Sequence, residues 1–184
     1  PVCTTTQISD YYEACYGANA SQTTCTNWEN ANTACDECLN TPASAAQWGE
    51  TVLISNTDFP DNYGGCFGIV LNEGASTTGC GAARWAYDRC LVAACPDTAC
   101  FADPANPTTA EQQAYDQCTT DAEAGPCKPA VDALNTKCAA LDNDATAAVL
   151  EAACGISEST YKAQLLKMAA TFCGGATGDA GGGG

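Results

Sequence analysis

Apolar and polar residues alternate at helical spacing along most of the chain. Tyr12 and Cys15 lie three apart, so on a helix they share one face while Glu13 points to water. The same unit of Tyr, acid, any residue and Cys recurs at 87–90 and 115–118, and each unit is followed nine or ten residues later by another cysteine. This recurrence predicts a helical hairpin that is repeated along the chain.

The segments that follow two of these units carry a second apolar pattern. In 28–38, Trp, Ala, Cys and Cys lie at i, i+3, i+7 and i+10, and 131–141 has apolar residues at the same spacing. Both segments are therefore predicted to be helices with a cysteine on the buried face. Pro129 is expected near the first turn of the second one, where its missing N–H costs nothing.

Two of the predicted helices have a recognisable start. Thr4 followed by Gln7, and Thr108 followed by Glu111, both fit the capping box, in which each side chain binds the other residue's backbone N–H. These residues predict helices that begin just after Thr4 and Thr108.

The C-terminal part predicts two more helices. One covers 145–154 and stops at Gly155, which favours the left-handed backbone of a helix end. The other is expected to be capped by Ser157 and carries an apolar stripe at 161, 165, 168 and 172, with Cys173 beside it.

The segment from about 49 to 81 has a different character. Its residues 51–54 and 66–71 are rich in β-branched and aromatic side chains, which favour strands. Residues 56–65 between them are rich in Asp, Asn, Pro and Gly and predict a loop. We expect an irregular insertion or a short β-hairpin, whose edge, if exposed, can pair with another chain.

Together these patterns predict a mainly α protein of repeated, disulfide-stapled helical hairpins. We expect one domain over 1–173 and a flexible Gly-rich tail over 174–184. The expected parts of the domain are sub-units at about 1–48, 80–106 and 107–173, with the insertion at 49–79.

The chain has 15 cysteines and no histidine. So many thiols favour an oxidising compartment, where they form disulfides, and the odd count leaves one over or available for an intermolecular bond. The candidate disulfide residues are Cys3, Cys15, Cys25, Cys35, Cys38, Cys66, Cys80, Cys90, Cys95, Cys100, Cys118, Cys127, Cys138, Cys154 and Cys173.

The sequence leaves the connectivity of the disulfides open. An antiparallel first hairpin favours Cys3 near Cys38, and Cys15 near the loop or the start of the second helix. The remaining pairs, and the identity of the unpaired cysteine, are not predicted.

The net charge of the chain limits the kinds of molecule that it is expected to bind. The formal net charge is −16, and without a basic stripe the chain is not expected to bind nucleic acid. No apolar stretch approaches 18 residues, so no membrane span is expected. We interpret the chain as a mature exported protein whose leader has been removed.

Metal and redox sites are not expected. Cys35 and Cys38 form a C-x-x-C pair, but zinc would need a second such pair or histidines, and the two acids between these cysteines raise thiol pKa values. Residues 142–146 resemble the start of a calcium loop, yet Ala147 and Ala153 stand where that loop needs Gly and Glu. We interpret 142–146 as a helix-capping turn and expect no cofactor.

Catalysis is also not expected. Without histidine, Ser-His and Cys-His chemistry is impossible. Asp58 and Asp61, with Trp48, Phe59 and Tyr63 nearby, are the best candidates for a sugar-cleaving carboxylate pair. We interpret them instead as parts of a turn, and predict that the protein is not an enzyme.

Aromatic residues offer the last candidate for a site. Tyr11, Tyr12 and Tyr16 cluster on the first predicted helix, and Trp85 and Tyr87 lie in the second unit. Tyrosines beside disulfides usually pack in a core, which is the interpretation we favour over a ligand groove.

Two hypotheses of function follow. The first is a non-enzymatic structural protein, secreted or on the cell surface, that is durable and self-associates into a filament or surface assembly, with the odd cysteine as an intermolecular link. The alternative is a secreted binding module for a lipid, a sugar or a basic protein partner.

Overall fold

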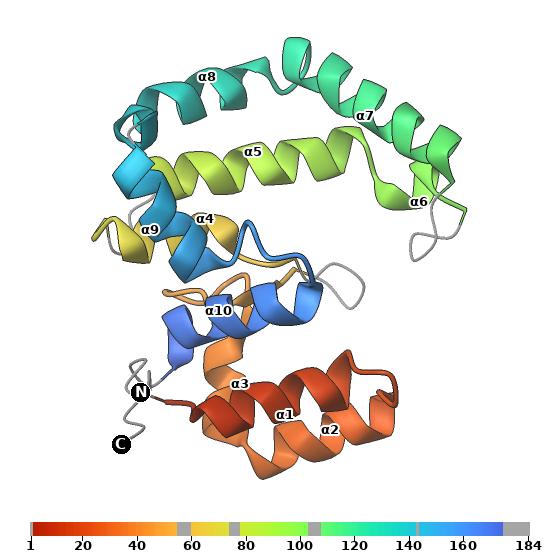
Figure 1. Ribbon diagram of the computed structural model, residues 1–184, viewed down its shortest axis with the longest axis vertical. Coiled ribbons are helices and arrows are strands. Elements are labelled where there is room, and N and C mark those ends of the chain that lie inside the picture. The colour runs from red at the N-terminus through yellow and green to blue at the C-terminus, as the bar shows by residue number, and fades with distance from the viewer. Residues whose placement is uncertain (1, 55–59, 74–77, 103–107, 143, 175–184) are drawn as a thin grey trace, which may run out of the picture.

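The computed structural model describes residues 2–54, 60–73, 78–102, 108–142 and 144–174 (Figure 1). The chain is mainly helical, as predicted, with one small two-stranded sheet. Its helices are stacked from the pair α1 and α2 at one end, through α10, α4 and α9, to α5 with α7 and α8 at the other end (Figure 1). The elements are α1 (Thr5–Cys15), α2 (Gln22–Ala31), α3 (Thr33–Leu39), β1 (Asn40–Pro42), β2 (Thr51–Leu53), α4 (Tyr63–Val70), α5 (Cys80–Ala94), α6 (Asp97–Cys100), α7 (Thr109–Ala124), α8 (Lys128–Lys137), the 3-10 turn Ala139–Asp142, α9 (Asp144–Cys154) and α10 (Tyr161–Cys173).

Both predicted capping boxes are confirmed. Thr4 caps α1, where Gln7 N donates to the Thr4 hydroxyl and the Gln7 side chain accepts from Thr4 N. Thr108 and Glu111 make the same reciprocal pair at α7. The backbone N–H groups of Ala102 and Thr108 and the Thr108 hydroxyl hold the pKa of Glu111 at about 2.

The predicted helix over 28–38 is interrupted at Asn32. Its apolar spacing is correct, but α2 ends at Ala31 and α3 begins at Thr33. The Asn32 amide donates to Trp28 O and its side-chain oxygen accepts from Gln7 Nε2. Asparagine side chains compete with the helix ladder in this way, so the segment bends here while both halves face the same core.

The insertion contains one of the two predicted strands. β2 pairs with β1 in parallel, with Thr41 opposite Val52, and an isolated antiparallel bridge joins Thr51 to Asp61. Residues 66–71 do not form the second strand, because Cys66 to Val70 belong to helix α4. A short apolar run is compatible with a buried strand or a buried helix, and packing decides between them.

Glycines allow this helix to pack closely against α5. An added Cβ at Gly64 would lie 2.4 Å from Gly81 O, and one at Gly81 would lie 2.3 Å from Gly64 O. The backbones of α4 and α5 thus approach more closely than side chains allow. This contact needs glycine on both helices and buries α4 on that face.

The C-terminal helices follow the sequence with two differences. α9 ends at Cys154 and Gly155 has φ +65°, as predicted. α10 is capped by Thr160, whose hydroxyl accepts from Ala163 N, so Ser157 is not the cap. α8 has its Pro in the first turn, as expected, but ends at Lys137, and the apolar pattern continues to Leu141 in a 3-10 turn.

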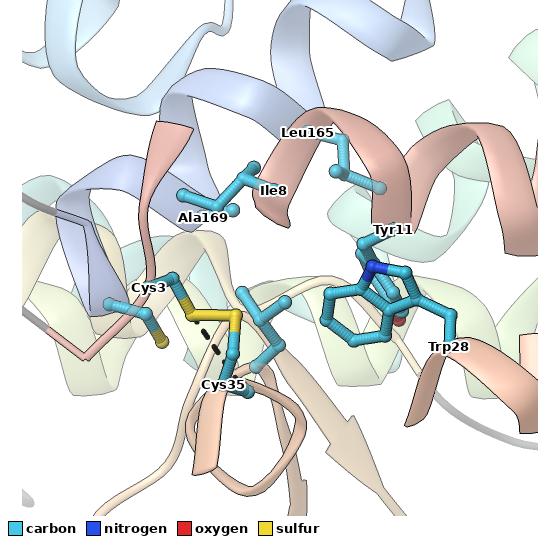
Figure 2. Packing of buried hydrophobic residues seen from close by; sticks show 9 residues of the cluster. Cys3, Ile8, Tyr11, Trp28, Cys35, Leu165 and Ala169 are labelled. Carbon is cyan, nitrogen blue, oxygen red and sulfur yellow. Dashed lines mark hydrogen bonds between the residues drawn. A yellow bond between two sulfur atoms is a disulfide. The ribbon is translucent and has the colours of Figure 1, made fainter. Parts of the chain in front are cut away.

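Three buried clusters make up the core of the described residues, and each contains cysteines. The first lies between α1, α2, α3 and α10, and Figure 2 shows the Cys3–Cys35 disulfide beside Ile8, Leu165 and Ala169. The second surrounds Phe67 and Leu150, and the third surrounds Ala122. Disulfide sulfurs therefore fill part of the volume that larger side chains fill in other small domains.

Candidate functional site

Seven disulfides connect the helices and account for every cysteine except Cys100. Some close short stretches and others join segments far apart in sequence, with separations from 10 to 135 residues. The pairs are Cys3–Cys35, Cys15–Cys25, Cys38–Cys173, Cys66–Cys154, Cys80–Cys138, Cys90–Cys127 and Cys95–Cys118.

The expected position of Cys15 is confirmed, and the bond of Cys3 differs from the expected neighbour Cys38 by one helical turn. Cys15 bonds Cys25 in α2, near the start of the second helix. Cys3 bonds Cys35, one helical turn before Cys38. The reason is α10, which packs against α1 and α3 and brings Cys173 to Cys38.

The repeated Tyr-x-x-Cys units are not closed alike. Only the first pairs its two cysteines with each other, as Cys15–Cys25. In the other two, Cys90 bonds Cys127 and Cys118 bonds Cys95, so the second and third units are linked to one another. This exchange leaves Cys100 without a sulfur partner.

Cys100 ends the short helix α6, which packs on α7, and its side chain is half-buried. The neighbouring Phe101 ring lies 5.1 Å from the Tyr115 ring, and Ala102 N donates to Glu111 Oε1 at 2.9 Å. These contacts hold the end of α6 against α7. The unpaired thiol is therefore carried on an anchored segment at the surface.

A groove of about 690 Å³ lies between α3, α4, α5 and the segment before β2. The rings of Trp48 and Trp85 meet there at 5.0 Å, and the Trp48 indole N–H donates to Ala43 O at 3.1 Å. Gly64, Gly68 and Gly81 are also in its lining. The groove thus offers aromatic surface and bare backbone to a ligand.

Polar side chains line the same groove. Glu37 and Gln47 bring a carboxylate and an amide to it, and Thr41 and Asn62 are also in its lining. Thr41 and Asn62 are engaged in the fold, since the Thr41 hydroxyl accepts from Gly49 N and the Asn62 amide donates to Gly49 O. Glu37 and Gln47 are therefore the better candidates to hydrogen-bond a ligand.

The predicted aromatic candidates fall into two groups. Tyr11 is 2% exposed and packs on Trp28 at 5.0 Å, so it belongs to the core. Tyr12 and Tyr16 both pack on Tyr161, and Tyr87 donates to Glu123. Of the five, only Trp85 is in the lining of the groove.

The structure separates the residues of the candidate carboxylate pair. Asp58 and Phe59 lie outside the described residues. Trp48 lines the groove, whereas Asp61 accepts from the Tyr161 hydroxyl at 3.3 Å and its charge raises the pKa of Tyr63. Trp48 and Asp61 therefore make their contacts in different parts of the fold.

Sequence reasoning missed Glu50, which is fully buried at the start of β2. Burial and the neighbouring Asp61 raise the pKa of Glu50 to about 8, and burial also raises the pKa of Asp61. No local pattern distinguishes Glu50 from the surface acids. Its burial follows from the strand pairing that encloses it.

The metal candidates gain no support from the described side chains. Cys15, Cys25 and Glu29 bring three ligand atoms within 4.8 Å of one another, but the two sulfurs are joined in a disulfide and offer no thiolate. Cys35 and Cys38 are bonded to other cysteines in the same way. Most side chains of the calcium-like segment 142–146 lie outside the part that the structure describes.

The described helices include none that is both long and apolar enough to span a lipid bilayer. The seven disulfides are consistent with an extracellular, durable protein. In comparisons with known proteins, no family model matches the chain, and no curated protein or solved structure resembles it significantly.

Proposed function

We propose that the chain is a non-enzymatic structural protein, secreted or on the cell surface, that works through its durability and associates with further copies of itself. The observation that carries this proposal is the disulfide network, which closes seven bonds and leaves Cys100 alone. The role needs no catalytic group, in keeping with a chain that has no histidine, and at net charge −16 we propose no nucleic-acid partner.

Durability rests on the way the bonds are distributed. Cys38–Cys173 and Cys66–Cys154 close loops with separations of 135 and 88 residues, which restricts the unfolded chain strongly. The other bonds staple neighbouring helices, and α6 is the one helix of the described chain whose own cysteine takes part in no internal disulfide. Such a molecule should resist proteases and surfactants.

Self-association through Cys100 has a definite geometry. One thiol per chain forms one intermolecular bond, so the covalent product is a two-fold dimer. A filament or surface layer would then need a second, non-covalent contact on each chain. The anchored position of α6 favours a defined partner geometry over a loose tether.

Non-reducing electrophoresis of native material, with free thiols blocked at lysis, tests this role. We expect a dimer that reductant converts to monomer, and a Cys100→Ser variant that is monomeric with an unchanged melting temperature. Cys127→Ser is a matched comparison, since it frees Cys90 and should lower the melting temperature. A monomer with one blocked thiol per chain would contradict the proposal.

A binding module is the second candidate, and the groove favours it. Its lining combines Trp48 and Trp85 with Glu37 and Gln47, and this mixture of aromatic faces and hydrogen-bonding groups suits a sugar better than a lipid tail. Sedimentation with insoluble polysaccharides tests it. Trp85→Ala should abolish binding that Val149→Ala, on the exposed face of α9, leaves intact.

A further inference from the structure

A buried carboxylate oxygen in this fold has no partner. Glu50 is completely buried, and the Thr51 hydroxyl donates to its Oε2 at 2.7 Å. Its other oxygen, Oε1, receives no hydrogen bond. Buried polar atoms are almost always paired, so an orphaned carboxylate oxygen needs an explanation.

A second carboxylate faces the same place. Thr51 forms an isolated bridge with Asp61, and Asn62 N donates to Glu50 O at 2.7 Å, which holds the backbone segments of the two acids side by side. Burial is the main cause of the raised pKa of Glu50, and the charge of Asp61 is the next. The two acids are therefore backbone neighbours whose charges repel each other.

The rest of the surroundings is neutral and oxygen-rich. The Tyr161 hydroxyl donates to Asp61, and the hydroxyls of Tyr11 and Tyr16 lie 3.3 Å apart. Burial raises the pKa of all three tyrosines, and the charge of Glu50 adds to it. Within the described ranges, no lysine or arginine forms an ion pair with Glu50 or Asp61. Two acids are thus enclosed by hydroxyls without a positive side chain.

We propose that Glu50 and Asp61 bind one calcium ion between β2, α1, α4 and α10. Calcium takes carboxylate, carbonyl and hydroxyl oxygens, and its two charges match the two carboxylates. The ion gives Glu50 Oε1 the partner that it lacks. Protonation alone does not do this, because Oε1 lacks a hydrogen-bond partner whether it is a carbonyl oxygen or carries the proton.

Other metals fit the residues less well. Zinc, copper and iron favour histidine and thiolate, whereas this site has only oxygen ligands and the chain has no histidine. Magnesium keeps several of its waters, which a fully buried Glu50 does not accommodate. The site goes beyond the proposed structural role, since neither self-association nor the groove requires it.

Terbium luminescence measures this site directly. Terbium(III) replaces calcium at oxygen sites and emits when nearby tyrosines absorb, so the tyrosines around Glu50 are built-in sensitisers. With the disulfide-intact full chain, we expect a signal that saturates at one ion and is displaced by calcium. A titration without saturation, or one that calcium leaves unchanged, would overturn the proposal.

Isosteric variants locate the ion. Glu50→Gln and Asp61→Asn should each weaken terbium and calcium binding about tenfold or more. Asp132→Asn removes one exposed acid on α8 and should bind as the unaltered chain does. Equal affinity in all three variants would place the ion elsewhere and contradict the proposal.

Thermal unfolding keeps the test decisive if a variant fails to fold. Calcium should raise the melting temperature of the unaltered chain above the value in an equal concentration of magnesium, because the ion binds only the folded site. Equal melting temperatures in calcium, magnesium and chelator would overturn the proposal without any variant.

Discussion

Glu50 shows how packing changes the chemistry of a single residue. The chain carries 22 acids, and among those whose side chains the structure describes Glu50 is the one that is buried. Burial raises the pKa of Glu50 to about 8, with the charge of the neighbouring Asp61 as the second cause. Glu50 is the acid in the described chain whose ionisation conflicts most with the fold.

The free energy of unfolding should therefore depend on pH in a definite direction when calcium is removed. Because the pKa of Glu50 is about 8 in the folded chain and 4.5 ordinarily, stability is full below pH 4.5, falls as pH rises and levels off above pH 8. The groups that face Glu50 are Asp61, whose raised pKa acts in the same direction, and tyrosines whose pKa values are raised out of this range.

Denaturant unfolding in chelator between pH 4.5 and pH 9 measures this slope. Glu50→Gln should flatten it, while Asp132→Asn, an exposed acid, should leave it unchanged. A slope that Glu50→Gln does not alter would mean that Glu50 is solvated in the folded chain. Since protons and calcium compete for the same oxygens, added calcium should also flatten the slope.

Gly81 tests the close contact between α4 and α5. A Cβ at this position would lie 2.3 Å from Gly64 O, where backbone has to move. Gly81→Ala should therefore lower the free energy of unfolding by about 1–3 kcal/mol, although alanine is the better helix former. Ala86→Ser, on the exposed side of α5, is the control. A Gly81→Ala chain as stable as the unaltered one would show that the helices can separate.

At the scale of elements, the capping boxes can be predicted from the sequence, whereas contacts between distant segments cannot. Thr4 and Thr108 predicted two helix starts because a capping box acts within three residues. The run 66–71 favours a strand by composition but belongs largely to helix α4, and its packing against Gly81 in α5 is not visible in the local sequence. The environment of Glu50 cannot be predicted from the local sequence either, because its neighbours come from four separate elements.

The disulfides contribute unequally to the free energy of unfolding. In the chain-entropy description, a cross-link with a separation of 135 residues contributes about 5 kcal/mol and one of 10 residues about 2.7 kcal/mol. Replacing Cys38 and Cys173 by alanine should therefore lower stability more than replacing Cys15 and Cys25. Calorimetry of the two double variants measures the difference. The opposite order would mean that local packing, and not chain entropy, dominates.

At the scale of the whole molecule, the protein combines a small core with many cross-links and a strong negative charge. Sulfurs take part in all three buried clusters, and the cross-links offset the self-repulsion of 22 acids against 6 bases. Both features suit a molecule that must persist outside the cell. Cys100 is the cysteine that these cross-links leave unpaired, and the proposed assembly therefore depends on it.

Disulfide mapping of native, thiol-blocked protein by mass spectrometry tests the central claim most directly. We predict seven internal cross-linked peptides with the pairing described above and an eighth that joins Cys100 of one chain to Cys100 of another. Recovery of Cys100 only as the blocked thiol, from a protein that runs as a monomer, would contradict self-association through this residue.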